Sequence, residues 1–288
     1  MHTIVITNYK GGSAKTTSTV SLAAALGERG FRVLVIDVDP QASATHWLGV
    51  DDPGRRLLDA YVGRRAVLDL VQPTSAPLVD LVPASQWLVA TDRHHETDIA
   101  LGIVRSIQRL PEEWDFVLVD CPPSQGYLAI APLSACRHVL VPVEAHLLAV
   151  PGVEALLSTM AQVRERVNPA LALDGILACR VNRTRHTRGV VDQLRERYPS
   201  HVLSTVVREN ISLAEAPAWQ LPITRYAPAS AGAEDYRSVV SDLLERWSIA
   251  DALGRSTSDD GLLVRAIGGF SSPSPEGTAN AAPTDGAR

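Results

Sequence analysis

Residues 8–17, Asn-Tyr-Lys-Gly-Gly-Ser-Ala-Lys-Thr-Thr, combine the residue types that bind phosphate groups. They follow an apolar run at 4–6, which predicts a strand, and precede a helical run at 19–29. A glycine turn between a strand and a helix presents free backbone N–H groups and the positive end of the helix dipole to an anion. Lys15 would add a point charge, and the Thr16 hydroxyl would complete a Mg²⁺ shell beside the phosphates. The stretch therefore predicts a nucleotide-phosphate site.

The loop departs from the ordinary phosphate-binding loop at two positions. The pattern G-x-x-x-x-G-K-[ST] requires glycine where this chain has Tyr9 and Ala14. The residues fit K-G-G-x-x-K-T-T instead, with a second lysine at Lys10; the alternative is a glycine turn that merely joins a strand to a helix. The chain contains two lysines, Lys10 and Lys15, against 25 arginines. Because a compact ammonium suits a phosphate cradle better than a planar guanidinium, this usage favours a nucleotide site that employs both lysines.

Composition limits the classes of protein to consider. Of the 288 residues, 45% are hydrophobic, which supports a substantial core, and the net charge of −5 restricts any nucleic-acid binding to a local patch. Three widely spaced cysteines are typical of reduced cytosolic thiols, and no apolar run approaches the ~20 residues that cross a bilayer. Because a predicted strand begins at the N-terminus, we also expect no signal peptide. These features favour a soluble cytoplasmic protein.

Apolar runs that alternate with helical patterns predict the arrangement of the chain. Continuous apolar runs are typical of strands buried on both faces of a parallel sheet. Such runs occupy residues 33–36, 116–119 and 139–143, and further strands are predicted at 173–179, 78–82 and 202–207. Helical patterns occupy residues 99–110, 150–167, 189–198 and 231–247. The alternation predicts an α/β fold with a doubly wound, mostly parallel sheet and helices on both faces.

The domain organisation follows from the same patterns. We expect one domain over residues 1–250, since the strand–helix alternation continues through them without an internal repeat. Residues 251–288 would form a C-terminal extension. From about residue 268 the chain consists largely of Gly, Ser, Pro, Ala and Thr, so we expect disorder there.

Acidic residues follow two of the predicted strands. Asp37 and Asp39 come after the strand at 33–36, and Asp120 comes after the strand at 116–119. Ligands of doubly wound sheets bind outside the carboxyl ends of the strands, so these side chains should lie beside the phosphate loop. Asp120 would hold the Mg²⁺ shell, and one of the other two would orient or deprotonate an attacking water. The alternative is that each aspartate caps a helix or opens a turn.

Together these motifs resemble the deviant-Walker ATPases, and within them the ParA/Soj branch that partitions plasmids and chromosomes. The likeness rests on the loop at 10–17, Asp-x-Asp-Pro-Gln at 37–41 and Asp-x-Pro-Pro at 120–123. It continues through Glu-Ala-Pro at 215–217 and Gly-Ala-Glu-Asp-Tyr at 232–236 and covers about residues 2–247. The resemblance implies a P-loop NTPase fold, slow Mg²⁺-dependent ATP hydrolysis stimulated by a partner, and a homodimer when ATP is bound.

The resemblance also implies a role for each matching residue. Lys15 would contact the β- and γ-phosphates within its own subunit, whereas Lys10 would reach the partner's phosphates across an ATP-sandwich dimer. Asp39 would activate water, which makes Lys10, Lys15 and Asp39 the expected catalytic residues. The expected ATP-binding residues are Lys10, Gly11, Gly12, Ser13, Ala14, Lys15, Thr16, Thr17 and Asn182. Thr16, Asp120 and, more indirectly, Asp37 would serve Mg²⁺.

Two of these positions leave alternatives open. Related ATPases read adenine with an asparagine near Asn182, but an asparagine after a strand is also a common turn residue. The glycine that the family usually carries before the loop lysine is Ala14 here. If that position needs a positive φ, the methyl group would cost about 1 kcal/mol, which would reduce affinity or turnover without abolishing binding.

Residues 176–210 contain seven arginines and three acidic residues, hence a net charge of +4. One interpretation is a solvated helix face. The other is a patch, doubled by dimerisation, that binds DNA phosphates without reading bases and with steep salt dependence. The resemblance favours DNA, because Arg183 matches a DNA-contacting position, although the second such position is Ser212 and Arg208 would have to replace it. The expected DNA contacts are Arg183, Arg185, Arg188 and Arg208.

The sequence therefore predicts a cytoplasmic, nucleoid-associated ATPase that drives plasmid or chromosome segregation. ATP would close a homodimer that binds DNA nonspecifically, and a centromere-binding (ParB-like) or cargo-adaptor protein would stimulate hydrolysis. One alternative is a ParA-like ATPase that positions a protein cargo, and another is a scaffold that has lost turnover. A MinD-like membrane-associated ATPase would need a basic amphipathic C-terminal helix, which residues 261–267 do not supply, so no stable membrane association is expected. A metal-cluster carrier would need paired cysteines.

Overall fold

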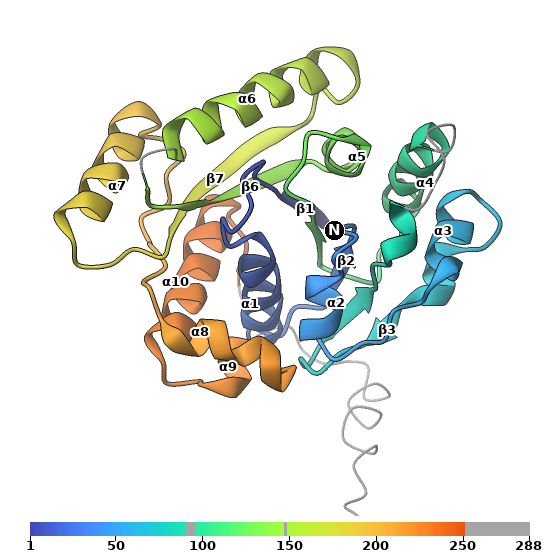
Figure 1. Ribbon diagram of the computed structural model, residues 1–288, viewed down its shortest axis with the longest axis horizontal. Helices are drawn as coiled ribbons and strands as arrows, with labels where there is room; N and C mark the ends of the chain where they lie inside the picture. Colours follow the sequence, from blue (N-terminus) through green and yellow to red (C-terminus); the bar gives the residue numbers. More distant parts are fainter. Residues whose placement is uncertain (90–95, 147–148, 251–288) are drawn as a thin grey trace, which may run out of the picture. The chain divides into compact units, whose positions relative to one another are not determined.

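The computed structural model describes residues 1–89, 96–146 and 149–250. The strands are β1 (His2–Ile6), β2 (Val33–Asp37), β3 (Gln72–Pro73), β4 (Val79–Val82), β5 (Phe116–Asp120), β6 (His138–Glu144) and β7 (Ala172–Cys179). The helices are α1 (Lys15–Glu28), α2 (Ser43–Trp47), α3 (Arg55–Tyr61), α4 (Glu96–Gln108), α5 (Tyr127–Ala135), α6 (Ala149–Arg166), α7 (Arg185–Arg197), α8 (Ile211–Glu215), α9 (Ile223–Tyr226) and α10 (Ala231–Arg246). Short 3₁₀ turns lie at Val67–Leu70, Gln86–Leu88 and Ala216–Trp219. Strands and helices alternate along most of the chain (Figure 1).

The strands form one seven-stranded sheet in the order β3-β4-β2-β5-β1-β6-β7. All neighbouring strands are parallel except β3 and β4, which are antiparallel. The register pairs Asp120 at the end of β5 with Ile6 of β1 on one side and with Asp37 of β2 on the other. The loop that leaves β1 therefore emerges beside both aspartates. The predicted α/β fold with a doubly wound, mostly parallel sheet is confirmed.

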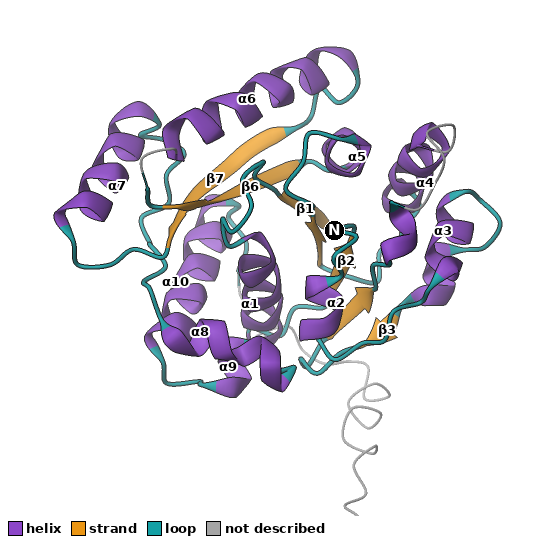
Figure 2. Ribbon diagram, viewed as in Figure 1, coloured by secondary structure: helices purple, strands orange, loops and turns teal. Residues whose placement is uncertain are grey.

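Successive side chains of each strand pack into separate cores on the two faces of the sheet, as the twofold period of a strand requires. Val33 and Val35 of β2 join the core that contains the apolar faces of α1 and α10. Leu34 and Ile36 join the other core, with residues of α3 to α7. Figure 2 shows these helices on both sides of the strands. Burial on both faces explains why the strands appear in the sequence as continuous apolar runs.

Three sequence predictions differ from the structure. The predicted strand at 202–207 is wrong: Val202 makes a single bridge to Ile176, and the Thr205 N–H donates to Asp242 of α10 at 2.9 Å instead of continuing the sheet. Helix α7 begins at Arg185, before the predicted 189, because Thr184 caps its N-terminus. Helix α5 was not predicted, since it contains Pro132 and is apolar on all sides, which hides its period.

None of the described helices is long and apolar enough to cross a bilayer. The predicted extension at 251–288 lies outside the described residues. The domain boundary near residue 250 and the disorder from about 268 stay predictions.

Candidate active site

The loop between β1 and α1 is shaped by Asn8. Its Nδ2 donates to the Pro142 carbonyl of β6 at 2.8 Å, and its Oδ1 accepts the Lys10 N–H at 3.1 Å. These bonds anchor the start of the loop to the neighbouring strand and turn it sharply. Gly12 then adopts φ +74° and Ala14 φ +66°, after which α1 begins at Lys15. Because Gly12 and Ala14 both have left-handed backbone conformations, the chain turns so that the first turn of α1 faces the loop.

Gly11 and Gly12 are exposed, and a Cβ at either position would meet no atom within 4 Å among the described residues. Gly12 needs its positive φ, whereas packing within the chain gives no reason for glycine at position 11. Ser13 is different: its Oγ is buried and has no hydrogen-bond partner in the part of the chain that the structure describes. Open glycines beside an orphaned buried hydroxyl are the features of a cradle that fits a phosphate chain.

The two lysines of the loop lie in different surroundings. Lys15 is 6% exposed, its Nζ donates to the Lys10 carbonyl at 3.1 Å, and burial lowers its pKa while the charges of Asp120 and Asp39 oppose that shift. Lys10 is more open, and its Nζ lies 3.6 Å from Glu144 Oε2 at the end of β6. Glu144 also pairs with Arg180, at 3.1 Å. The ammonium of Lys15 is thus held inside the loop, whereas that of Lys10 is more exposed and pairs with Glu144 at the rim of the site.

Asp120 lies directly beneath the first turn of α1. Its Oδ2 accepts the Thr16 hydroxyl at 2.7 Å and its Oδ1 accepts the Thr19 hydroxyl at 3.0 Å. The residue is fully buried, and burial raises the pKa of Asp120 to about 7 against the opposing hydrogen bonds from Thr16 and Thr19. A buried carboxyl of this kind gains from a nearby cation.

Asp37 and Asp39 differ in how they are held. Both oxygens of Asp37 are engaged: Oδ1 accepts the Asp39 N–H at 3.0 Å, and Oδ2 accepts the Thr45 N–H and hydroxyl at 2.9 and 2.8 Å. Burial and, next, the charge of Asp120 raise the pKa of Asp37 well above its ordinary value. Asp39 lines the cavity described below, and its Oδ1 accepts the Gln41 N–H at 2.9 Å. Asp37 therefore supports the turn, and Asp39 faces the site.

A cavity of about 810 Å³ opens in front of the loop. This volume lies within the ~300–1,000 Å³ typical of small-molecule sites. Its near wall is formed by residues 12–17 with Asp39, Gln41, Ser43 and Pro123. Its far wall is formed by residues 207–211, 213 and 214 with Cys179, Arg180 and Tyr236. Sequence reasoning identified the near wall but missed the far wall, whose signals were the neighbouring Glu-Ala-Pro motif at 215–217 and the Gly-Ala-Glu-Asp-Tyr motif at 232–236.

The donor set fits Mg²⁺ bound together with a nucleotide. The Thr16 hydroxyl and the Asp120 carboxylate lie together at the cradle, and oxygen ligands suit this ion. Within the described residues, no group of three or more His, Cys, Asp or Glu side chains could hold a metal by itself. Mg²⁺ usually takes few protein ligands and completes its shell with phosphates and water, so this sparse set is compatible with it.

Ala14, where the family that the sequence resembles usually carries glycine, adopts a positive φ. Because its φ of +66° is left-handed, the methyl group is strained by about 1 kcal/mol. We expect Ala14→Gly to change the free energy of unfolding by less than about 1 kcal/mol, since glycine relieves this strain but raises the entropy of the unfolded chain. Ala14→Val should destabilise by about 2 kcal/mol or more, because a β-branched residue tolerates this φ poorly. Urea unfolding of both variants measures this, and equal loss in both would contradict it.

Asn182 sits in the turn between β7 and α7. Its Oδ1 accepts the Thr184 N–H at 3.1 Å and the Thr184 hydroxyl at 2.7 Å, and its Nδ2 donates to Glu209 at 3.3 Å. Asn182 is not among the described residues that line the cavity. These bonds correspond to the turn interpretation, and a role in reading adenine stays a prediction.

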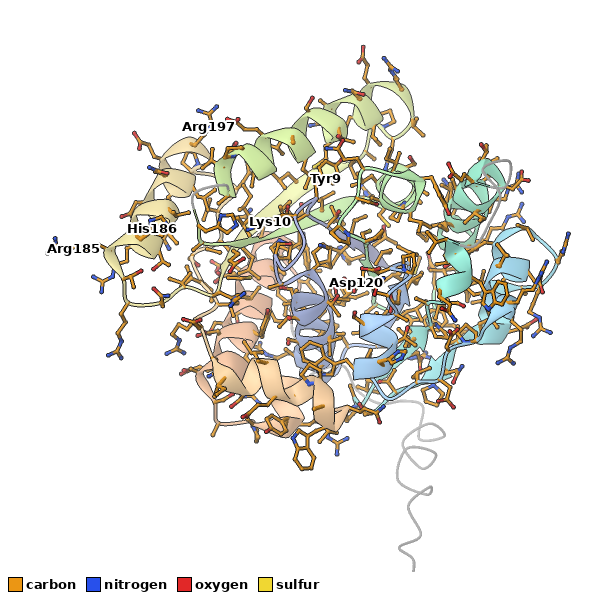
Figure 3. All side chains as sticks on the ribbon, viewed as in Figure 1. Tyr9, Lys10, Asp120, Arg185, His186 and Arg197 are labelled. Carbon is orange, nitrogen blue, oxygen red and sulfur yellow. The ribbon has the colours of Figure 1, made fainter. Side chains whose placement is uncertain are left out.

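The arginines predicted to bind DNA separate into two groups. Arg183, Arg185 and Arg188 are exposed at the N-terminal end of α7, where Figure 3 shows Arg185 at the outer edge of the molecule. Arg208 lines the cavity instead, and its guanidinium pairs with Asp235 at 2.6 Å and with Glu234 at 2.8 Å. The structure therefore does not bring Arg208 together with the other three.

Three comparisons relate the chain to known proteins. Residues 1–173 match the family model of the AAA domain. The chain is 34% identical over 245 residues to the sporulation initiation inhibitor protein Soj of Bacillus subtilis (strain 168), an alignment that spans 83% of this chain and 97% of that protein. It is 37% identical over 245 residues to the chromosome-partitioning ATPase Soj of Thermus thermophilus, spanning 84% and 95% of the two chains.

Solved structures agree with the fold. The structure is similar to that of cobyrinic acid a,c-diamide synthase from Mycobacterium smegmatis with bound ADP and magnesium, with a TM-score of 0.73 and 31% identity. The similarity covers 86% of this chain and 96% of that chain.

Proposed function

The chain belongs to the Soj/ParA family of P-loop ATPases, and from this premise we propose that its ATP-bound dimer binds DNA nonspecifically and drives plasmid or chromosome segregation. The protein is an ATPase that uses ATP with Mg²⁺. Dimerisation and DNA binding are the new parts of the proposal. They are argued in turn from Lys10 and from the arginines of α7.

The observation that carries the proposal is the position of Lys10. Among the described residues, Lys10 does not line the cavity, although it belongs to the same loop as Lys15. Its ammonium pairs with Glu144 at the rim, and the exposed Gly11 and Gly12 beside it leave room for a second surface. A lysine held outside its own site, next to open glycines, is suited to reach the phosphates of a facing copy of the chain.

Within one subunit the remaining groups divide the chemistry. Lys15 binds the β- and γ-phosphates, and the cradle N–H groups orient them. Thr16 and Asp120 would hold Mg²⁺, which would supply charge neutralisation for the phosphates. Asp39, facing the cavity, orients the attacking water and accepts its proton. Asp37 fixes the turn that aims Asp39.

DNA binding is supported by the arginines at the start of α7. Arg183, Arg185 and Arg188 are exposed and lie close together in the sequence, and in a dimer the cluster would occur twice. Arginines contact DNA phosphates whatever the base sequence, and such contacts supply affinity without sequence specificity. We place the protein in the cytoplasm on nucleoid DNA, where a centromere-binding or cargo-adaptor protein stimulates hydrolysis and releases it.

The proposal is tested by binding to a nonspecific DNA duplex with ATP, with ADP and without nucleotide, across a salt series. We expect binding with ATP alone, together with a doubling of mass by light scattering. Arg183→Glu removes one phosphate contact per subunit, so the slope of log affinity against log salt should fall by about 2 in the dimer.

The matched control is Arg65→Glu, which makes the same charge change at an exposed site beyond α3. It should leave the slope unchanged. A dimer that forms with ATP but ignores DNA, or equal losses in both variants, would contradict the DNA part of the proposal.

A further inference from the structure

Residues 207–210 of the far wall belong to no helix or strand and lead directly into α8. Val207, Arg208, Glu209, Asn210 and Ile211 all line the cavity opposite the phosphate loop. Backbone bonds tie the segment to the end of β7: the Val207 N–H donates to the Ala178 carbonyl at 2.8 Å, and the Glu209 N–H donates to the Val181 carbonyl at 3.0 Å. We expect this wall to face the ribose and base of a nucleotide whose phosphates the loop binds.

Asp235 of α10 binds this wall through hydrogen bonds to Arg208. Its Oδ2 accepts the Arg208 backbone N–H at 2.8 Å, and its two oxygens accept the Arg208 Nε at 2.9 and 3.0 Å. The Arg208 Nη2 adds a bond of 2.6 Å to Oδ1. Asp235 is 6% exposed, so this ion pair is shielded from water on the aspartate side. A forked pair that also binds the backbone fixes both the side chain and the main chain of Arg208.

The same turn of α10 also holds the near wall. Tyr236, next to Asp235, is fully buried, lines the cavity, and has its hydroxyl 3.1 Å from Ser18 Oγ of α1. Helix α1 begins at Lys15, so Tyr236 contacts the element that presents the phosphate loop. At Gly232, a Cβ would lie 2.9 Å from Leu213 Cγ, which shows how closely α10 approaches the far wall. The first turns of α10 therefore set the spacing between the two walls.

From this geometry we propose that Asp235 is a positioning residue that holds the nucleoside-binding wall of the cavity in place through Arg208. The inference rests on the cavity being the nucleotide site and deepens the proposed function. Asp235 is not among the described residues that line the cavity, so it would act through Arg208. It acts on the ribose and base end, whereas the phosphate end is shaped independently by residues 8–17.

The test uses ADP and inorganic pyrophosphate as probes, each measured by calorimetry with Mg²⁺. Asp235→Asn keeps the side-chain volume but removes the charge that grips Arg208. We expect it to weaken ADP binding about tenfold, a change of about 1.4 kcal/mol, and to leave pyrophosphate binding within about twofold. The KM for ATP should rise similarly with kcat nearly unchanged, because the wall contacts ground and transition states alike.

Two further variants make the result decisive. The ion pair of Arg237 with Glu28 also connects α10 to α1, but neither residue is among the described residues that line the cavity. The control variant Arg237→Gln breaks this pair and should leave ADP binding unchanged. Arg208→Lys keeps the charge and removes the fork, so it should weaken ADP binding like Asp235→Asn; it carries the test if the Asn variant does not fold.

Unchanged ADP binding in Asp235→Asn or Arg208→Lys, or an equal loss of ADP and pyrophosphate binding, would overturn the inference. ADP binding to a single chain requires neither a dimer nor DNA. A failure of the proposed DNA switch would therefore appear separately, as an ATP-bound protein that ignores DNA.

Discussion

Lys15→Met should lower the affinity for ADP by at least about 100-fold, because it removes the one ammonium that lies within the phosphate cradle. Lys15 is almost fully buried and already oriented by the Lys10 carbonyl. A buried charge-assisted contact of this kind is worth about 2–5 kcal/mol, and no side chain nearby replaces it among the described cavity-lining residues of the near wall. Calorimetry with Mg²⁺ and ADP measures the loss.

The stability of the nucleotide-free protein should respond much less. Burial penalises the ammonium of Lys15, while Asp120 and Asp39 attract it, and these effects oppose each other. We expect the free energy of unfolding to change by about 1 kcal/mol or less. A large loss of stability together with a small loss of affinity would mean that Lys15 supports the fold and not the ligand.

Lys10→Met is the matched control, since it makes the same substitution in the same loop. Its ammonium pairs with Glu144 at the rim, so ADP binding by a single chain should stay within about threefold of the unsubstituted protein. Turnover of ATP should nevertheless fall, because the proposed dimer loses the lysine that reaches the facing site. If Lys10→Met lost ADP binding as severely as Lys15→Met, both lysines would serve their own subunit, and the main argument for a facing copy would be lost.

The sequence was sufficient for the parts of the fold and site that local chemistry determines. Continuous apolar runs identified the central strands, because burial on both faces leaves no alternation. The sequence predicted that Asp37 and Asp120 lie close together, since the ends of parallel strands meet at one edge of the sheet. The register of β2 and β5 pairs the two residues directly. The condition in the prediction for Ala14 is met, because the residue has a positive φ, and the expected loss of affinity or turnover stays a prediction.

The sequence was insufficient where contacts between distant segments decide the outcome. Arg208 was expected on a DNA-binding surface, but Asp235, 27 positions later, draws its guanidinium into the cavity wall. No local sequence pattern predicts the ion pair of Arg208 with Asp235. The segment at 202–207 has the β-branched composition of a strand, yet α10 competes for its backbone through Asp242. Asn182 could be assigned to a turn or to a ligand from its type alone, and its hydrogen bonds became visible only in three dimensions.

Asp39→Ala should lower kcat at least about 100-fold while ATP binding is retained, because a positioned general base contributes about 10²–10⁴ to the rate. The Asp39 carboxylate lines the cavity, whereas the residues that hold the phosphates belong to the loop and stay in place. The ATP-bound state should therefore persist. Single-turnover hydrolysis and retention of ATP on the protein measure the two effects.

Asp39→Asn separates catalysis from structure. Asp39 Oδ1 also accepts the Gln41 N–H at 2.9 Å, and asparagine can keep that bond while losing the ability to take a proton. If Asp39 acts on water, both variants should be equally slow. Near-normal turnover in Asp39→Asn would instead assign the residue to the turn alone.

The Asp39→Ala variant also tests whether ATP hydrolysis times the release of the protein from DNA. In the proposed mechanism the ATP-bound dimer binds DNA through the arginines of α7, and ATP hydrolysis releases the dimer from DNA. Blocking hydrolysis should therefore prolong DNA binding. Asp39→Ala with ATP should leave nonspecific DNA at least about 10-fold more slowly than the unsubstituted protein, and adding Arg183→Glu should reverse this by weakening the phosphate contacts. Dissociation rates at fixed salt decide the matter: a rate for Asp39→Ala equal to that of the unsubstituted protein would show that hydrolysis does not time the release of DNA.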